Sequence, residues 1–308
     1  LPYQLSSDQK KCAWEILQDL EKEKPMSRVL QGDVGSGKTI VALISILNTI
    51  KNNYQSALMV PSEILAKQHY QSALELFKGL NFKIALLSSK RQEANFELPK
   101  TKKKKTEEIS QTADLIIGTQ SLIQDGVHFK KLALVVVDEQ HRFGVNQRQE
   151  ILKKNIDDNK LKTTPHFLSM TATPIPRTMA LKSFSNLDFS IINQKPPGRL
   201  PIKTKIIKSE SERQKTYRFI EEEIKKGRQA FIICPLIDPS DKFGARSVKN
   251  EYERLKQDEF PQIEMAMLHA KLKTEDKEEI MKKFSQNKIK IIVSTSVIEV
   301  GIDIKSAT

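Results

Sequence analysis

The chain contains Val29-Leu30-Gln31-Gly32-Asp33-Val34-Gly35-Ser36-Gly37-Lys38-Thr39, which matches the phosphate-binding pattern G-x-x-x-x-G-K-[ST]. Two apolar residues precede the pattern and a helix-like run over 39–48 follows it, so a strand, a loop and a helix are predicted in that order. Gly35 and Gly37 let backbone N–H groups approach phosphate oxygens, and the start of the helix adds its positive dipole end. The sequence therefore predicts binding of a nucleoside triphosphate.

The residues of this loop have separate expected roles. Lys38 would contact the β- and γ-phosphates and act in catalysis, and the Thr39 hydroxyl would bind Mg²⁺. The nucleotide would be held by the whole loop, which consists of Gly32, Asp33, Val34, Gly35, Ser36, Gly37, Lys38 and Thr39.

The composition is that of a basic, globular chain. A length of 308 residues suggests about two domains, each large enough for its own core. The net charge of +13 favours a polyanionic partner such as nucleic acid. The run Lys102–Lys105 supplies part of that charge, and we expect it to be solvated. The charge therefore supports a nucleic-acid partner but does not require one.

The apolar runs and the two cysteines indicate where in the cell the protein works. No apolar run approaches the roughly 20 residues that span a bilayer, so no membrane partner is expected. Cys12 and Cys234 are far apart and form no metal-binding spacing, which favours a reducing, cytosolic compartment. The chain begins at Leu1 and not at Met, so we expect it to be a piece of a longer protein.

Short apolar runs alternate with helical patterns along the chain. Continuous apolar strands separated by helices predict an α/β fold with parallel sheets flanked by helices. Ser7 or Asp8 would cap a first helix that ends near Leu20. Residues 88–112 break the pattern with lysine, glutamate and proline, and we expect an exposed, mobile insertion there. Strands are expected at 57–60, 83–87, 114–117, 132–137 and 167–170, and a helix at 62–78.

A second α/β unit is predicted after a proline-rich linker. Residues 194–201 contain three prolines and a glycine, which interrupt both helices and strands. We therefore expect a first domain at 1–193 and a second at 202–308. In the second domain, strands are expected at 202–207, 230–234, 264–268 and 290–294, and helices at 212–226 and 274–284.

Two carboxylates follow the buried strand expected at 132–137. Ligands bind at the carboxyl ends of strands in open α/β sheets, so Asp138 and Glu139 are expected in the nucleotide site. Asp138 would bind Mg²⁺, and Glu139 would polarise the attacking water as general base. His141 would sense the nucleotide, although a single histidine is more often structural.

Other candidate residues lie at helix starts and strand ends. The Gln9 amide both donates and accepts, which suits the edge of adenine, although it could equally be a solvated first-turn glutamine. The hydroxyls of Thr171 and Thr173 would bond the Asp138–His141 segment. Small groups that would hold a nucleic-acid backbone, with helix capping as the alternative, are Pro61, Ser62, Gly118 and Thr119.

Seven sequence motifs resemble those of superfamily 2 helicases, and more narrowly those of the RecG family of bacterial ATP-dependent DNA helicases. Four lie in the first domain, at 32–39 (Gly-Asp-Val-Gly-Ser-Gly-Lys-Thr), 61–69 (Pro-Ser-Glu-Ile-Leu-Ala-Lys-Gln-His), 138–145 (Asp-Glu-Gln-His-Arg-Phe-Gly-Val) and 170–178 (Met-Thr-Ala-Thr-Pro-Ile-Pro-Arg-Thr). Three lie in the second, at 232–237 (Ile-Ile-Cys-Pro-Leu-Ile), 268–273 (Leu-His-Ala-Lys-Leu-Lys) and 294–303 (Ser-Thr-Ser-Val-Ile-Glu-Val-Gly-Ile-Asp).

The resemblance implies two RecA-like P-loop NTPase domains that use ATP and Mg²⁺. It implies a monomeric motor on branched or duplex DNA, which reverses stalled forks and migrates four-way junctions in recombination and repair. It also implies roles for particular residues: adenine recognition by Gln9, nucleotide contact by Gly301 and Asp303, nucleic-acid contact by Thr295, and coupling by Gln140, His141, Thr171, Thr173 and Arg177.

Two segments typical of that family are expected to be missing from the chain. An arginine-rich motif normally follows the last motif, and its arginine would complete the ATP site. Because an arginine finger contributes roughly 10³–10⁵ in rate, we expect weak hydrolysis by this fragment. An N-terminal wedge domain that recognises forks would precede Leu1, so junction selectivity is expected to be poor.

Three other functions compete with this prediction. The motor of the transcription-repair coupling factor shares the motifs around His141 and Arg177, but that family usually has Glu at the position of Gln140 and often Phe at that of Ser36. A nucleic-acid clamp gated by ATP would not translocate. A P-loop kinase or transporter ATPase would lack the motifs of the second domain.

Overall fold

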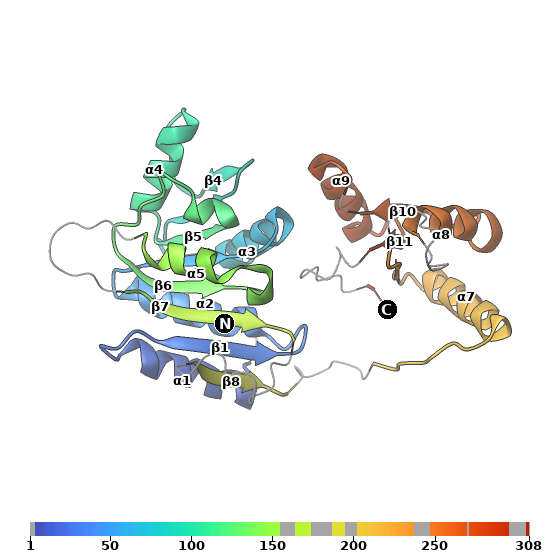
Figure 1. Cartoon of the computed structure of the whole chain (residues 1–308), viewed down its shortest axis with the longest axis horizontal. Coiled ribbons are helices and arrows are strands. Elements are labelled where there is room, and N and C mark those ends of the chain that lie inside the picture. Colours follow the sequence, from blue (N-terminus) through green and yellow to red (C-terminus); the bar gives the residue numbers. More distant parts are fainter. Residues whose placement is uncertain are drawn as a thin grey trace. The chain divides into compact units, whose positions relative to one another are not determined.

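The chain folds into two units of alternating strands and helices, residues Leu1–Arg199 and Leu200–Thr308. A computed structural model describes residues 4–154, 164–173, 187–194, 202–236, 247–269, 271–295 and 306–307 (Figure 1). Each unit has its own sheet and its own buried apolar cluster.

The described part of the first unit contains one eight-stranded sheet in the order β4-β3-β5-β2-β6-β7-β1-β8. All neighbouring strands are parallel except β3 and β4. Strands β4 and β8 lie at opposite edges (Figure 1). The strands are β1 (Ser27–Gly32), β2 (Gln55–Met59), β3 (Ile84–Leu87), β4 (Gln92–Ala94), β5 (Leu115–Gly118), β6 (Leu132–Val137), β7 (His166–Thr171) and β8 (Asp188–Ile192).

Helices connect these strands and cover the sheet. They are α1 (Ser7–Leu20), α2 (Lys38–Lys51), α3 (Glu63–Leu76), α4 (Lys102–Thr112) and α5 (Val145–Leu152), with short 3₁₀ turns η1 (Gln120–Ile123) and η2 (Gln140–Arg142). In the part of the chain that the structure describes, no helix is both long and apolar enough to cross a membrane.

Helix α1 begins one or two residues earlier than the sequence predicted, since the cap was expected at Ser7 or Asp8. Ser6, and neither Ser7 nor Asp8, is the N-cap, and its hydroxyl accepts a hydrogen bond from the Gln9 backbone N–H. The Gln9 side chain accepts in return from the Ser6 N–H at 2.9 Å. This reciprocal capping box satisfies two N–H groups at once, which explains why the cap lies at Ser6.

The prediction that residues 88–112 form an exposed insertion is wrong, because this segment packs against the sheet. Strand β4 pairs antiparallel with β3, and helix α4 follows it. Ile109 of α4 is fully buried, and Phe96 and Leu98 pack against the same apolar cluster. A few apolar residues in a polar stretch are therefore enough to attach the segment to the sheet.

The edge strand β8 was not predicted from the sequence. It pairs parallel with β1, and a buried polar network fixes it there. Arg28 of β1 forms an ion pair with Asp19 of α1 at 2.7 Å and donates to the Ser190 hydroxyl of β8 at 3.0 Å. These contacts join α1, β1 and β8 near the amino end of β1.

The described part of the second unit contains a three-stranded parallel sheet in the order β10-β11-β9. Its apolar cluster is centred on Val248, Leu255, Phe260 and Ile291. The α/β class with parallel strands is thus confirmed. The elements are α7 (Glu210–Lys225), β9 (Ala230–Ile233), α8 (Val248–Arg254), the π-helical turn η3 (Leu255–Glu259), β10 (Met265–Leu268), α9 (Thr274–Ser285) and β11 (Ile291–Ser294).

The strand predicted at 202–207 is wrong. Residues 202–208 pair with no strand in the part of the chain that the structure describes, and Ile202 and Ile206 are 71% and 75% exposed. Alternation of apolar residues predicts which face of a strand would be buried, but it does not supply a neighbouring strand.

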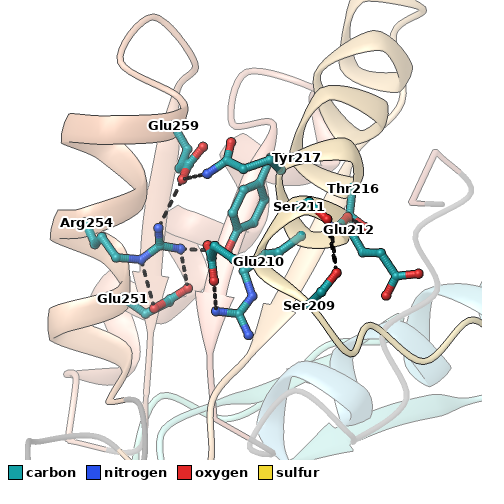
Figure 2. Close-up of polar contacts among 11 residues, drawn as sticks. Ser209, Glu210, Ser211, Glu212, Thr216, Tyr217, Glu251, Arg254 and Glu259 are labelled. Atoms are coloured by element: carbon teal, nitrogen blue, oxygen red, sulfur yellow. Dashed lines mark hydrogen bonds and ion pairs between the residues drawn. The ribbon is translucent and has the colours of Figure 1, made fainter.

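A polar cluster around Arg254 joins α7 to α8 and η3 (Figure 2). The Arg254 guanidinium donates to Glu251 at 2.9 Å, to Glu259 at 3.1 Å and to the Tyr217 hydroxyl at 2.6 Å. Gln214 of α7 donates to the same Glu259 oxygen at 3.0 Å. These bonds, led by those to Glu251, hold the pKa of Arg254 above its ordinary value, so the guanidinium stays charged.

Candidate nucleotide-binding site

Three neighbouring strand ends of the first unit carry the predicted nucleotide residues. Strands β6, β7 and β1 are adjacent and parallel. Asp138 follows β6, Thr171 ends β7 and Gly32 ends β1. Since parallel strands end at the same edge of a sheet, this edge gathers residues from three distant parts of the sequence.

The loop between β1 and α2 has the backbone that its glycines permit. Gly35 and Gly37 have φ angles of 71° and 90°, which side-chain-bearing residues rarely adopt. A Cβ atom on Gly37 would lie 2.2 Å from Nε2 of Gln9, so any larger residue would displace that side chain. Because the N-cap of α2 is this glycine, no side chain caps the first N–H groups of the helix, and they can bind an anion.

Lys38 lies against the loop that it follows. Its Nζ donates to the carbonyl oxygens of Gly32 at 2.7 Å and Asp33 at 3.1 Å. Burial lowers the pKa of Lys38, and the nearby carboxylates of Asp138 and Glu139 oppose that shift. The ammonium is therefore positioned between the loop and the two predicted acidic residues.

The loop also contains a hydroxyl that fits a phosphate. Ser36 is 2% exposed, and its Oγ has no hydrogen-bond partner among the described residues. A buried hydroxyl without a partner is unfavourable, and a phosphate oxygen would satisfy it. Thr39 lies in the first turn of α2, and the Val34 side chain is exposed at the loop surface.

Gln9 contacts the loop through its side-chain amide. Its Nε2 donates to the Ser36 carbonyl at 2.7 Å, and its Oε1 accepts from the Ser6 N–H. Gln9 is therefore not the solvated residue that was the alternative, because it is only 6% exposed. The amide keeps one further N–H and one further lone pair, which is the pair of groups that adenine recognition needs.

Asp138 is buried and both of its carboxylate oxygens are engaged. Oδ1 accepts from the Glu139 N–H at 3.0 Å, and Oδ2 lies 3.1 Å from Nε2 of His69. His69 was missed by the sequence analysis. It lies in the motif at 61–69, and the signal was a histidine on the buried face of α3, with Leu65, Ala66 and Tyr70.

Glu139 is held in an unusual conformation. Its φ of 49° lies in the left-handed region, where the other non-glycine residues of the described chain are the asparagines Asn53 and Asn287. Asparagine tolerates this region but glutamate seldom adopts it, and such strain is often found at functional sites. Burial and the charge of Asp138 raise the pKa of Glu139, as is expected of a general base.

The predicted coupling residues lie around Glu139. His141 is exposed, and its Nδ1 lies 3.4 Å from Oε2 of Glu139. Gln140 is buried, and its Oε1 has no hydrogen-bond partner in the described part of the chain. Thr171 and Thr173 pair their hydroxyls with each other at 2.9 Å. The hydrogen bond to the Glu139 carboxylate instead comes from the backbone of Ala172. The end of β7 is therefore joined to the Asp138–His141 segment by a backbone group and not by the predicted threonine hydroxyls.

The predicted nucleic-acid residues have clear local contacts. Ser62 caps α3 by accepting from the Leu65 N–H, which is the capping role left open above, and Pro61 precedes it. A Cβ atom on Gly118 would lie 2.3 Å from the Leu87 carbonyl oxygen, so close packing requires a glycine there. Thr119 lies 3.4 Å from the Ser121 hydroxyl.

Thr295 of the second unit follows β11. It is buried, and its hydroxyl has no hydrogen-bond partner among the residues that the structure describes. Three further predicted residues, Arg177, Gly301 and Asp303, lie outside the described residues, as does most of the predicted linker at 194–201.

Comparison with known proteins places both units in helicase families. A profile of the DEAD/DEAH box helicase family matches residues 6–181, and one of the helicase conserved C-terminal domain matches residues 213–308. The chain is 42% identical to the ATP-dependent DNA helicase RecG of Thermotoga maritima over 307 residues, and 45% identical to that of Streptococcus pneumoniae over 309 residues. Each match covers the whole chain, but it spans only 38% and 44% of those relatives.

Solved structures give the same result. The chain resembles RecG in a structure bound to a three-way DNA junction, with a TM-score of 0.76, 38% identity, and coverage of 100% of this chain and 38% of that one. The DEAD-box helicase Mss116 shares the fold at a TM-score of 0.69 and 17% identity, over 98% of this chain and 63% of its own. The two RecA-like domains and the resemblance to RecG are thus confirmed, and the chain belongs to the DEAD/DEAH box helicase family.

Proposed function

We propose that the chain is the motor of an ATP-dependent DNA helicase that acts on branched DNA in recombination and repair. Its relatives at 42–45% identity are named ATP-dependent DNA helicase RecG, and a RecG structure holds a three-way DNA junction. The relatives are bacterial, which supports work in the bacterial cytoplasm. We propose a monomer that uses ATP and Mg²⁺.

The observation that carries the proposal is the position of Lys38. Its ammonium is held at the phosphate loop and interacts with the charges of Asp138 and Glu139. This arrangement places a cation that could bind the β- and γ-phosphates beside two carboxylates, those of Asp138 and Glu139, whose surroundings differ. Because Asp138 is hydrogen-bonded on both oxygens while the pKa of Glu139 is raised, the two carboxylates suit different tasks.

Asp138 and the Thr39 hydroxyl are the residues that would hold Mg²⁺. The described residues contain no cluster of three or more His, Cys, Asp or Glu able to hold a metal. A site with only Asp138 and Thr39 as protein ligands still suits Mg²⁺, because Mg²⁺ usually binds one or two protein groups together with the phosphates of its substrate. When bound, Mg²⁺ would neutralise charge that develops on the phosphates.

Glu139 would orient and polarise the attacking water. Its strained backbone aims the carboxylate independently of Asp138, and the Ala172 backbone N–H holds it. Five residues around this site would then transmit whether nucleotide is bound to the rest of the motor: Gln140, His141, Thr171, Thr173 and Arg177. We further propose that Pro61, Ser62, Gly118, Thr119 and Thr295 contact the DNA backbone, and that Gly301 and Asp303 complete nucleotide contact.

Two measurements test this function. The chain should bind a fluorescent ATP analogue in the presence of Mg²⁺, and Lys38→Ala should weaken that binding. In the natural protein, ATP should drive strand separation of a three-way junction, and Glu139→Gln should abolish it while nucleotide binding is retained. A protein that binds junctions only when ATP is present, without separating strands, would instead be a clamp.

A further inference from the structure

His69 is a buried histidine that the proposed roles above do not use. It lies on α3, seven residues after the N-cap Ser62, and its side chain is 7% exposed. Helix α3 packs mainly against β3 and β5, whereas the phosphate loop follows β1 and Glu139 follows β6. His69 therefore reaches the candidate nucleotide site from a helix that carries none of the other proposed nucleotide-binding residues.

The imidazole of His69 meets the carboxylate of Asp138 from that helix. Nε2 of His69 lies 3.1 Å from Oδ2 of Asp138, and the Asp138 side chain is 11% exposed. An ionised carboxylate can only accept hydrogen bonds, so Nε2 carries the hydrogen. The other oxygen, Oδ1, accepts from the Glu139 N–H. Each oxygen is thus held by one donor and keeps a lone pair for a metal ion.

We propose that His69 is a positioning residue for Mg²⁺: it fixes the Asp138 carboxylate in the orientation that binds the metal. This proposal rests on the proposed function, because it assumes that Asp138 binds Mg²⁺. A carboxylate held on one oxygen only, by its own neighbour in sequence, would rotate about its side-chain bonds. Donors that orient metal-binding side chains typically contribute 10–100-fold to metal affinity.

The test compares side chains at position 69 that differ in their reach. His69→Gln keeps an amide N–H about as far from the backbone as the imidazole Nε2. His69→Asn carries the same amide one methylene shorter, so its N–H falls short of Asp138. His69→Leu removes the donor and keeps the bulk. The matched control is His166→Leu, which removes a partly buried histidine of β7 whose Nδ1 accepts from the Met26 N–H and not from the Asp138 region.

The readout is binding of a fluorescent ADP analogue at a series of MgCl₂ concentrations and in EDTA. We expect His69→Asn and His69→Leu to raise the half-saturating Mg²⁺ concentration about tenfold or more, with binding in EDTA unchanged. His69→Gln should stay near the wild-type value, and His166→Leu should lower stability only. The Gln and Asn pair suffices if the Leu variant does not fold.

Two results would overturn the proposal. In the first, His69→Asn shows the wild-type dependence on Mg²⁺. In the second, His69→Gln is as impaired as His69→Asn, which would assign the histidine to packing alone. A wild-type chain that binds no nucleotide at any Mg²⁺ concentration would instead contradict the proposed function, so the two failures are distinguishable.

Discussion

Nε2 of Gln9 donates a 2.7 Å hydrogen bond to the carbonyl oxygen of Ser36, so helix α1 supports the phosphate loop directly. The same amide accepts from the Ser6 N–H and completes the capping box of α1. One side chain therefore links the start of the first helix to the loop that would bind the nucleotide. Gly37 allows this contact, because a Cβ there would occupy the position of the Gln9 amide.

Gln9→Ala should weaken ATP binding about tenfold and reduce the preference for ATP over GTP. The amide supplies a loop contact and free groups for adenine, and each hydrogen bond contributes about 0.5–1.5 kcal/mol. Competition binding with ATP and GTP measures both effects. Ser6→Ala is the matched control: it removes the cap, at about 1 kcal/mol of stability, but leaves the bond to Ser36. A Gln9→Ala variant with normal nucleotide affinity and a lower Tm would contradict the role in adenine recognition.

Glu139→Gln should stabilise the nucleotide-free protein at neutral pH. Burial and Asp138 raise the pKa of Glu139 above its ordinary value of 4.5, so the charged form is disfavoured in the folded state. Stability linked to this group is fully present below pH 4.5 and is lost as pH rises through the folded pKa. We expect the variant to have a higher Tm than wild type at pH 7–8 in EDTA, and the difference to vanish near pH 4.5. A lower Tm at neutral pH would contradict the environment assigned to Glu139.

The strand ends that carry the candidate site residues were predicted from the sequence more completely than the rest of the fold. The loop, Asp138 and Glu139 lie in local patterns, since each follows a strand of consecutive apolar residues. His69 could not be found in that way, because its contact with Asp138 joins residues 69 positions apart. The same limit explains the missed strand β8 and the wrong strand at 202–207. Pairing depends on a partner elsewhere in the chain, which alternation within a segment does not reveal.

His166→Asn should reduce the loss of stability on acidification. The neutral Nδ1 of His166 accepts from the Met26 N–H at 3.0 Å, and burial lowers the pKa of His166 below 6.5, against the opposing charge of Asp19. Stability linked to a lowered pKa is present above pH 6.5 and is lost as pH falls through the folded value. Asparagine keeps an acceptor near Nδ1 and does not titrate. Thermal unfolding between pH 7.5 and 5 measures the effect, with the exposed His128→Asn as control. Equal pH dependence in wild type and His166→Asn would contradict this assignment.

Arg254→Met should destabilise the second unit by about 1.5–3 kcal/mol. The guanidinium bonds Glu251, Glu259 and Tyr217 (Figure 2), and the side chains of Glu251 and Glu259 are largely buried. Arg213→Met is the matched control, because Arg213 pairs with a mostly exposed Glu210 at 3.1 Å. Exposed pairs contribute only about 0–1 kcal/mol. Urea unfolding of both variants separates the two cases, and equal losses would show that the cluster is not a stabilising contact.

Gly118 and Thr119 should respond differently to substitution, although both were predicted to contact DNA. Gly118→Ala places a methyl group 2.3 Å from the Leu87 carbonyl oxygen and 2.9 Å from the Leu122 side chain. We expect a loss of about 1–3 kcal/mol of stability from this overpacking, because the backbone of β3 cannot move aside without breaking its pairing with β5. Because glycine can contact DNA only through its backbone groups, which alanine keeps, the effect on DNA binding at low temperature, where the variant is folded, should be small.

Thr119→Ala should instead weaken duplex DNA binding while the Tm stays close to that of wild type. The Thr119 hydroxyl is only loosely paired, 3.4 Å from that of Ser121, so its removal leaves the fold intact. Loss of one hydrogen bond to a phosphate corresponds to about 0.5–1.5 kcal/mol, or roughly two- to tenfold in affinity. Fluorescence anisotropy with labelled duplex at fixed salt measures this change. Unchanged DNA affinity in Thr119→Ala, together with a lower Tm, would contradict the DNA contact and leave Thr119 only its position as the N-cap of η1.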